Sequence, residues 1–412
     1  MMNRVVITGM GAVSPIGNDI DEILKNVKSG YCGIDFITNF DTSDFKVKLA
    51  AEVKNLDILD YVDRRDRRRM DQVSIFALIA AIKAFEDSGI DPDKSDRDSM
   101  GVYVSTGIGG LKTIEDQHKR GMKSGFEKLS PFFIPMAISN LTASNISARL
   151  GLHGSCIAPV TACAGSNTAI GEAYRNIKHG YSKLILAGGS ESSITPLGIG
   201  GFSSMKALSE SEDKNRASIP FDKERDGFVM AEGSAILVLE ELEHALARGA
   251  HIYGEVLGYG STCDAEHITQ PNEEGIFAAK AMEEAIREAG IEKSQIDYIN
   301  AHGTSTPLND KFETLAVKRV FGEDAQDIYM SSTKSMTGHM LAASGSMEAM
   351  ITLLAMGDGI IPATINHRIE DPECDLNVVK NDYIEEDITY AISNSLGFGG
   401  HNVSLVLKKW ED

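Results

Sequence analysis

The stretch APVTACAGSNTAIGEAYRNIKHG, residues 158–180, places a single cysteine between a β-branched run and an amphipathic segment. The apolar residues after Cys163 recur at the spacing of one helical face, at Ile170, Ala173 and Ile177. His179 and Gly180 then supply a helix stop signal. The preceding run CIAPVTA, residues 156–162, is strand-like. The stretch therefore predicts a sharp strand-to-helix corner with Cys163 at or near the helix N-terminus.

The position of this cysteine bears on its reactivity. Cysteine is among the most buried residue types, and buried cysteines mostly pack as small inert side chains. At a helix N-terminus, unpaired N–H groups and the positive end of the helix dipole favour the thiolate, which is the nucleophilic form. We therefore expect Cys163 to be an activated nucleophile, with an inert core residue as the alternative.

Short strand-like segments alternate with helical ones, and the alternation occurs twice. The strand-like segments are 4–10, 101–107, 184–191 and 235–240, followed by 253–260, 296–303, 328–334, 390–396 and 403–409. Helical patterns in the second set cover about 274–290, 308–321 and 345–356. This alternation of strands and helices predicts an α/β protein with largely parallel or mixed buried sheets. We expect two halves that pack closely, 1–250 with the cysteine and 251–412.

Composition narrows the classes of function. The 412 residues include 40 Lys and Arg against 60 Asp and Glu, a net charge of −20 that opposes binding to nucleic acid or an anionic membrane. No run of eighteen apolar residues occurs, and the N-terminal segment lacks a signal-peptide pattern, so we expect a cytoplasmic protein. The five cysteines are scattered without CxxC spacing, which favours reduced thiols over a disulfide framework.

A glycine turn near the N-terminus does not make a dinucleotide site. The run VVITGMGAVSPIG, residues 5–17, leaves a strand into G-x-G, but the third glycine of the fingerprint falls on Ser14 and Pro15 follows it. We expect no nucleotide cofactor here.

Two further loops carry histidines at strand exits, where sites in α/β folds gather. NAHGTSTPLND, residues 300–310, holds His302, and TKSMTGHMLAASGSME, residues 333–348, holds Lys334 and His339. A lone histidine is more often structural, but two beside a corner cysteine suggest a catalytic triad. The alternative from another class is a zinc site made by Cys163 and both histidines.

Six motifs together resemble one family. They are RVVITGMGAVSPIG (4–17), VTACAG (160–165), IPFDKERDGFVMAEG (219–233), NAHGTSTPLND (300–310), TKSMTGHMLAASG (333–345) and NSLGFGGHN (394–402). In order and spacing they resemble the β-ketoacyl-acyl-carrier-protein synthases of the thiolase superfamily, most closely the type II condensing enzymes of bacterial fatty acid synthesis. The resemblance covers essentially the whole chain. It implies a five-layered αβαβα fold built from two pseudo-symmetric halves.

The resemblance also implies a reaction and its residues. Cys163 would take an acyl chain from a carrier-protein thioester, and malonyl-carrier protein would lose CO2 and attack that acyl group, lengthening it by two carbons. His302 and His339 would stabilise the enolate by donating hydrogen bonds. The N–H groups of Cys163 and Phe398 would form a separate oxyanion hole, with Phe398 also gating the site. The resemblance further implies an ion pair between Lys334 and Glu348, with Asp310 and Glu313 lying behind the histidines. It implies that Thr304 and Thr306 bind pantetheine and that Ile108 forms the floor of the acyl pocket. Phe202 and Gly399 would contribute to substrate binding.

Partners follow from charge and from the same resemblance. The run VDRRDRRRMD, residues 62–71, is an arginine island on an acidic chain, so it is either a solvated helical face or a dock for an acidic carrier protein. We expect Arg68, Arg69 and Lys206 to belong to that dock. The resemblance implies a homodimer and a mechanism that needs no cofactor or metal, with a polyketide-type ketosynthase as the closest alternative.

The chain departs from the common family pattern in and beside the pocket. The departures include Ala342, Ser344, Leu396 and His401. The preferred length of the acyl chain therefore does not follow from the resemblance.

Overall fold

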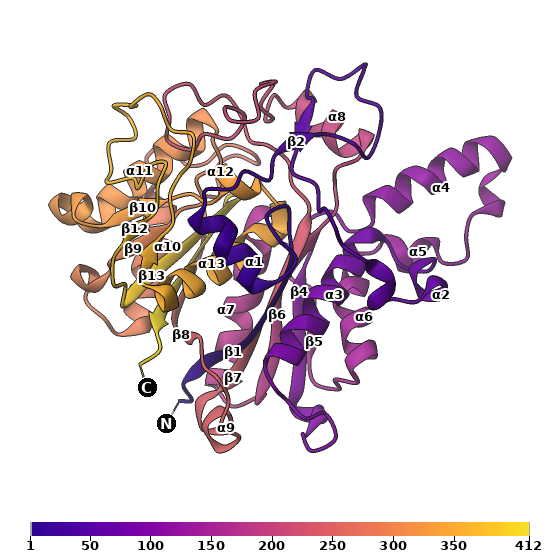
Figure 1. Ribbon diagram of the computed structural model, residues 1–412, viewed down its shortest axis with the longest axis horizontal. Coiled ribbons are helices and arrows are strands. Elements are labelled where there is room, and N and C mark those ends of the chain that lie inside the picture. Colours follow the sequence, from indigo (N-terminus) through magenta and orange to yellow (C-terminus); the bar gives the residue numbers. More distant parts are fainter. Residues whose placement is uncertain (1, 412) are drawn as a thin grey trace.

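The computed structural model describes residues 2–411, and its frame is a ten-stranded mixed sheet (Figure 1). The strand order is β10-β9-β13-β14-β8-β1-β7-β6-β4-β5. The strands are β1 Val5–Val13, β4 Met100–Ser105, β5 Cys156–Ile157, β6 Leu184–Glu191, β7 Gly233–Glu241, β8 Gly254–Cys263, β9 Tyr298–Asn300, β10 Tyr329–Ser331, β13 Tyr390–Gly397 and β14 His401–Lys409. Two-stranded pairs outside this sheet are β2 Asp35–Phe36 with β3 Leu49–Ala50, and β11 Ile360–Ile361 with β12 Ile384–Glu385.

The sheet contains one pairing pattern twice, as the repeated alternation in the sequence predicts. From β1 outward, β1–β7 and β7–β6 are antiparallel, and β6–β4 and β4–β5 are parallel. From β8 outward, β8–β14 and β14–β13 are antiparallel, and β13–β9 and β9–β10 are parallel. The two halves meet where β1 pairs antiparallel with β8. The domain boundary expected at 250/251 stays a prediction; it falls between α9 (Leu242–Ala247) and β8.

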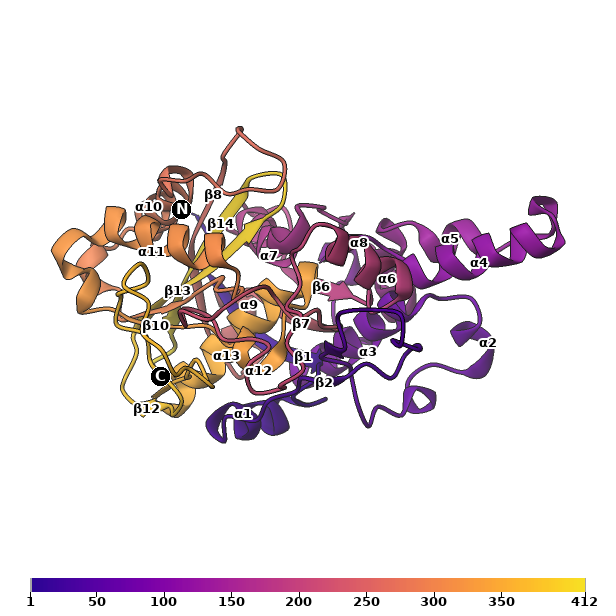
Figure 2. The same ribbon diagram turned by 90° about the horizontal axis from the view of Figure 1, so that it is seen from above.

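Helices lie in three layers around these two halves (Figures 1 and 2). α3 (Gln72–Asp87) and α6 (Asn140–Leu150) cover the first half on its outer side, and α10 (Ile276–Ala289) and α11 (Pro307–Phe321) cover the second. Between the halves, α7 (Gly165–Lys178) and α13 (Ser344–Asp358) pack on each other and on strands of both. The molecule therefore has the five-layered αβαβα arrangement that the family resemblance implies.

Close packing fixes the middle layer. β1, β6 and β7 are buried along their whole length, as expected of strands covered on both faces. On α7, a Cβ at Gly171 would lie 2.3 Å from the ring of Tyr259 in β8, so only glycine lets this helix approach the sheet. Because α7 and α13 are held this tightly, the loops at their N-termini have defined positions.

The other helices lie at the edges of the molecule, except α12 (Lys334–Thr337), which is buried. They are α1 Ile20–Lys28, α2 Arg64–Arg67, α4 Leu111–Ser124, α5 Phe133–Ala137, α8 Pro196–Ser204 and α12 Lys334–Thr337. α4 projects from the first half beside α5 (Figure 2). Among residues 2–411, no helix combines the length and apolar character needed to cross a membrane.

Each segment predicted as a strand contains a strand, and each segment predicted as a helix contains a helix. The one difference lies at the cysteine corner. The sequence predicts a strand over 156–162, but only Cys156–Ile157 pair, with β4. Pro159 offers no N–H to a ladder, and Ala162 has a φ of +49°, which breaks the extended backbone.

Candidate active site

Cys163 lies at the corner predicted for it. A single 3-10 turn, Ala162–Ala164, leads directly into α7 at Gly165. A Cβ at Gly165 would lie 2.1 Å from the Ser105 hydroxyl oxygen, so the corner packs directly on the end of β4. Helix α7 ends at Lys178 and is capped by His179, as the stop signal predicts.

Cys163 is not a resting thiolate, although a helix N-terminus favours that form, and its role as the nucleophile stays a prediction. Burial raises the pKa of the Cys163 thiol to about 11, from an ordinary value of 9.0. The positive charge of Lys334 and the N–H groups of Phe398 and Cys163 act in the opposite direction, but burial outweighs them. Desolvation disfavours the charged form of any acid, and the helix end does not compensate for it here. Cys163 is therefore a protonated thiol at neutral pH.

The GFGG loop between β13 and β14 passes beside the cysteine backbone. A Cβ at Gly397 would lie 2.7 Å from the Thr161 carbonyl oxygen and 3.2 Å from the Cys163 nitrogen, so only glycine permits this approach. Gly399, with a φ of +91°, continues the turn. The loop brings the Phe398 N–H near the thiol, where it helps to stabilise negative charge on sulfur.

His302 is held through its backbone as it leaves β9. Glu313 on α11 accepts the N–H groups of both His302 and Gly303, each at 2.8 Å. The Lys334 ammonium donates to the His302 carbonyl oxygen at 2.6 Å and stands 3.5 Å from Nδ1 of the ring. Asp310, on the same helix as Glu313, accepts the N–H of Phe221 and does not touch the ring. Carboxylate and ammonium together fix this histidine from behind.

His339 comes from the other histidine loop. The backbone N–H of His339 donates to the Val229 carbonyl oxygen at 2.7 Å, and the ring Nδ1 lies 2.9 Å from the hydroxyl oxygen of Ser344. The ring packs edge-on against Phe228 at 5.1 Å between centroids. It stands 5.4 Å from the His302 ring at an interplanar angle of 83°.

Both imidazoles are neutral. Burial lowers the pKa of His302 and of His339 well below 6.5, and the charge of Lys334 lowers both further. Each side chain is only 2% exposed. At neutral pH each ring therefore has one N–H to donate.

The expected ion pair is present. The Lys334 ammonium contacts the Glu348 carboxylate on α13, and both side chains are almost completely buried. Burial raises the pKa of Glu348 to about 7, while Lys334 pulls it down. The pair joins the loop of His302 to the helix that follows His339.

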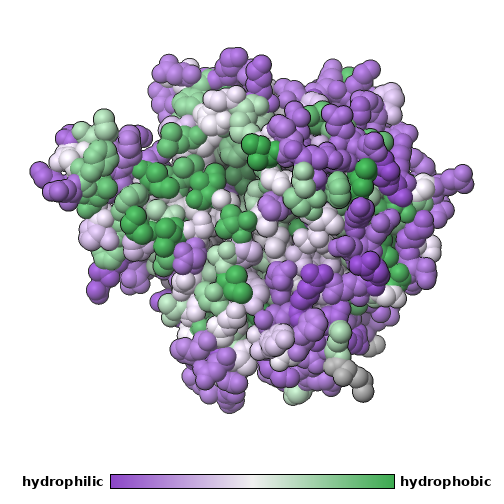
Figure 3. Space-filling model, turned by 180° about the vertical axis from the view of Figure 1, so that it is seen from behind, coloured by the Kyte–Doolittle hydropathy of each residue, from purple (hydrophilic) through white to green (hydrophobic). Residues whose placement is uncertain are grey.

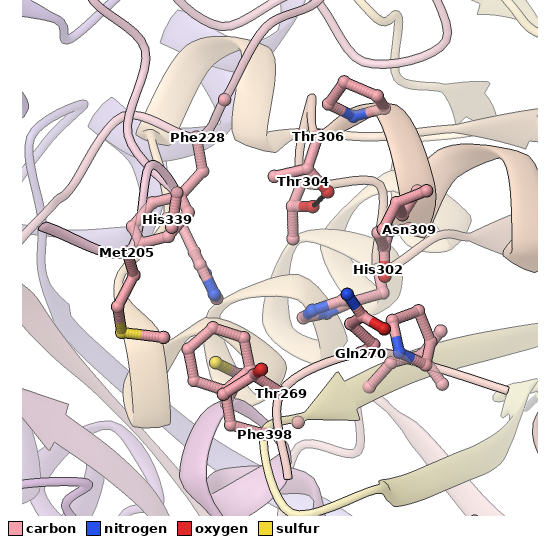
Figure 4. Close-up of a pocket in the computed structure, with 18 of the residues that line it drawn as sticks. Met205, Phe228, Thr269, Gln270, His302, Thr304, Thr306, Asn309, His339 and Phe398 are labelled. Carbon is pink, nitrogen blue, oxygen red and sulfur yellow. Dashed lines mark hydrogen bonds between the residues drawn. The ribbon is translucent and has the colours of Figure 1, made fainter. Parts of the chain in front are cut away.

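These groups face one cavity of about 400 Å³. Figure 4 shows the rings of His302 and His339 directed into the same space, with Phe398 on one side and Thr304 and Thr306 on the other. The residues predicted for the site that line it are Cys163, Lys206, His302, Thr304, Thr306, His339 and Phe398. The hydroxyls of Thr304 and Thr306 are 3.0 Å apart.

Other predicted residues lie outside the lining of this cavity. Phe202 stands behind it, with its ring 6.3 Å from Phe398 and 5.5 Å from Phe228. Gly399 belongs to the adjoining loop, and Ile108, which is 36% exposed, does not line the cavity. Arg68 and Arg69 follow α2, whereas Lys206 follows α8. Both ribbon views place these two helices apart (Figures 1 and 2), so the three residues of the expected dock do not form one cluster.

The zinc alternative lacks support from the geometry. Within residues 2–411, no group of three or more His, Cys, Asp and Glu side chains is placed to hold a metal ion.

Sequence reasoning missed several side chains around the cavity. Phe228 packs on His339, Gln270 lies beside His302, and Thr269 lies beside Phe398 (Figure 4). Ser344, which the sequence places in or beside the pocket, contacts His339. Phe228 lies inside one quoted motif, so the motif could have indicated it. Ser344 is expected near the pocket, but its contact with His339 is not predicted. Nothing in the sequence brings the segment of Thr269 to this cavity.

Comparison with known proteins agrees with this geometry. The family model "Beta-ketoacyl synthase, N-terminal domain" matches residues 2–245, and the C-terminal domain model matches residues 253–368. A 3-oxoacyl-[acyl-carrier-protein] synthase 2 of Staphylococcus aureus is 48% identical over 408 residues, covering 99% of each chain. The enzyme of the same name from Synechocystis is 47% identical over 409 residues, covering 99% of this chain and 98% of the relative.

Solved structures extend the likeness to three dimensions. A type II polyketide ketosynthase in complex with its acyl-carrier protein has a TM-score of 0.93 at 34% identity. A beta-ketoacyl synthase from Burkholderia phymatum has a TM-score of 0.91 at 35% identity. Both match over 100% of each chain. The cysteine and two neutral histidines line one cavity, and these matches over the whole chain show that it belongs to the beta-ketoacyl synthase family.

Proposed function

We propose that this chain is an elongating 3-oxoacyl-[acyl-carrier-protein] synthase of fatty acid synthesis. It condenses malonyl-carrier protein with an acyl group held on Cys163. The observation that carries the proposal is the meeting of Cys163, His302 and His339 in one cavity, in a chain 48% identical over its length to synthases of that name.

The first step is a thioester exchange. The sulfur of Cys163 attacks the carbonyl carbon of the acyl-carrier thioester; a new C–S bond forms, the old one breaks, and the thiol proton leaves on the carrier thiol. Lys334 and the N–H of Phe398 favour the thiolate as it forms, since both act to lower the pKa of the thiol. The raised resting pKa leaves the empty enzyme with a weakly reactive sulfur.

The second step is decarboxylation. Malonyl-carrier protein loses CO2, and the bonding electrons become an enolate with its charge on the thioester oxygen. Two neutral imidazoles donate hydrogen bonds to that oxygen as the charge develops, which suits rings with pKa values well below 6.5. Removal of one such donor costs on the order of 100- to 1000-fold in rate.

The third step is carbon–carbon bond formation. The enolate carbon attacks the acyl carbonyl on Cys163, and the N–H groups of Cys163 and Phe398 hold the resulting oxyanion. Collapse of this intermediate breaks the C–S bond, releases the 3-oxoacyl-carrier thioester, and leaves a cysteine thiolate that takes up one proton. The close passage of Gly397 past the Cys163 nitrogen supports this pairing of N–H groups.

The acyl chain is proposed to run toward Ile108. The turn at Gly109 and Gly110 packs on the backbone of α5, since Cβ atoms there would lie 2.6 Å and 2.1 Å from the carbonyl oxygens of Ala137 and Met136. Ile108 therefore sits beside α5, and its size limits the chain. Thr304 and Thr306 take the pantetheine arm.

A homodimer completes this region in the proposal. Exposed apolar residues lie at β5, an edge strand of the sheet, and at α5: these are Ile157 and Val160, and Ile134 and Ile138. Figure 3 shows apolar side chains gathered on the side of the molecule that carries α4 and α5. Apolar patches of this kind mark association surfaces. Light scattering tests the dimer, and a monomer at micromolar concentration contradicts it.

The proposed partner is an acidic acyl carrier protein in the cytoplasm. Arg68 and Arg69 offer positive charge on a chain of net charge −20, and Lys206 lines the catalytic cavity itself. Glu313 holds the loop of His302 as a positioning residue, and Asp310 on the same helix holds the backbone of Phe221.

A polyketide-type ketosynthase is the second candidate, because a polyketide enzyme shares the fold at 34% identity. The lower identity favours the fatty acid function. Incubation with acyl- and malonyl-carrier proteins of graded length, followed by mass spectrometry of the products, tests both. We expect one two-carbon extension of saturated acyl chains, and no product from Cys163→Ala. Multiple extensions without release would support the polyketide function, and the absence of any acyl adduct on Cys163 would overturn both.

A further inference from the structure

The two histidines of the cavity have different supports behind their rings. Nδ1 of His302 stands 3.5 Å from the Lys334 ammonium. Nδ1 of His339 instead stands 2.9 Å from the hydroxyl oxygen of Ser344. Within residues 2–411, this is the one side-chain hydrogen bond of the His339 ring and the one hydrogen bond of the Ser344 hydroxyl. Both side chains are about 2% exposed, so water does not compete for the contact.

A neutral imidazole donates from one nitrogen only, so its tautomer decides what it can do. Stabilising an enolate requires the proton on the nitrogen that faces the cavity. An ammonium can only donate, so Lys334 forces a lone pair onto Nδ1 of His302 and the proton onto Nε2. A hydroxyl can donate or accept, so the direction of the Ser344 bond needs its own argument.

The position of Ser344 favours donation. It is the first residue of α13, so its hydroxyl oxygen lies at the positive end of the helix dipole. Lone pairs directed at that end are stabilised, which leaves the hydroxyl proton for Nδ1 of His339. Ser346, two residues on, shows the ordinary alternative, since its hydroxyl donates to the Ala343 carbonyl oxygen at 3.1 Å.

We propose that Ser344 is a positioning residue that donates its hydroxyl proton to Nδ1 of His339 and thereby holds His339 as the Nε2–H tautomer facing the cavity. The inference rests on the proposed role of His339 in decarboxylation. Ser344 touches no reacting atom and acts only through the ring. A seryl hydroxyl thus does for one histidine what an ammonium does for the other.

The first test is the rate of malonyl-carrier decarboxylation. Ser344→Ala removes the donor while the ring remains, so we expect a loss of about tenfold, less than the loss on removing a whole oxyanion donor. Ser344→Cys, a near-isostere with a weaker donor, falls between wild type and alanine. Ser346→Ala is the matched control: it removes a buried hydroxyl from the same helix turn and leaves the rate within twofold of wild type.

Two further readouts separate positioning from a structural role. In ¹⁵N-histidine spectra, wild-type His339 shows the Nε2–H tautomer, and Ser344→Ala shows a measurable Nδ1–H fraction. Acyl transfer to Cys163 stays within twofold of wild type, because that step does not use the His339 proton. An unchanged tautomer together with an unchanged decarboxylation rate would overturn the inference, as would equal losses in both half-reactions.

A double-mutant cycle keeps this inference distinct from the proposed function. In a His339→Ala background, Ser344→Ala has no further effect on decarboxylation if the hydroxyl acts through the ring. An additive loss contradicts the inference. If His339→Ala alone leaves decarboxylation unchanged, the proposed role of His339 fails and the inference falls with it. If His339→Ala is inactive while Ser344→Ala matches wild type, only the inference fails.

Discussion

The resting state of Cys163 can be tested by raising the pH of the empty enzyme. With a thiol pKa of about 11, roughly one molecule in ten thousand carries a thiolate at pH 7, against roughly one in a hundred for the ordinary value of 9.0. The rate of alkylation by iodoacetamide follows the thiolate fraction. It should therefore rise about tenfold per pH unit from pH 7 to pH 10, without levelling off.

The assay must isolate this sulfur from the other cysteines. Cys156 and Cys263 are exposed and also react, so the label on the Cys163 peptide is measured by mass spectrometry, with Cys163→Ala giving the background. Melting curves confirm that the protein stays folded over the range. A plateau reached at or below pH 8 would show that the helix end and Lys334 prevail over burial, and would refute the assignment of a protonated resting thiol.

Three further predictions concern the groups behind the cavity and the arginines after α2. Glu313→Gln puts an amide where a carboxylate accepts two backbone N–H groups, so urea unfolding should show a loss of about 1–3 kcal/mol and kcat should fall. Lys334→Met leaves Glu348 unpaired and raises its pKa above the present value of about 7. The folded state then holds a proton that the unfolded chain releases above pH 4.5, so the stability lost relative to wild type should grow as pH rises from 7 to 9. Reversing charge at Arg68 and Arg69 should raise KM for carrier-bound malonyl several-fold at low salt, with no change for malonyl-pantetheine and a smaller effect at high salt.

Much of the fold can be predicted from the sequence because it depends on patterns that are local. Buried parallel strands are near-continuous apolar runs, and such a run predicts strand β6 with its observed bounds, Leu184–Glu191. Helix ends carry their own signals, as at His179. The edge segment before Cys163 is the exception, since Pro159 and the positive φ of Ala162 shorten a strand that composition favours.

In the candidate site, too, features that belong to a local motif could be predicted, and features that depend on the folded chain could not. Residues inside quoted motifs, such as His302 and Lys334, could be predicted because the motif fixes them. The charge state of Cys163 could not, because it is the difference between a burial penalty and the fields of groups more than a hundred residues away in the chain. Thr269 and Gln270 line the cavity from a segment without any motif, and only the folded chain brings them there.

The same burial acts in opposite directions on the two halves of the chemistry. It keeps His302 and His339 neutral, as the proposed decarboxylation needs, and it raises the pKa of Cys163, which disfavours the thiolate that the proposed acyl transfer uses. Lys334 helps both, because an ammonium at this place lowers the pKa of the thiol and of both rings. Its partner Glu348 is equally buried, so removal of Glu348 would leave the Lys334 ammonium without its paired carboxylate. The buried pair is therefore better explained by chemistry than by stability, since a buried ion pair is weak evidence of stabilisation.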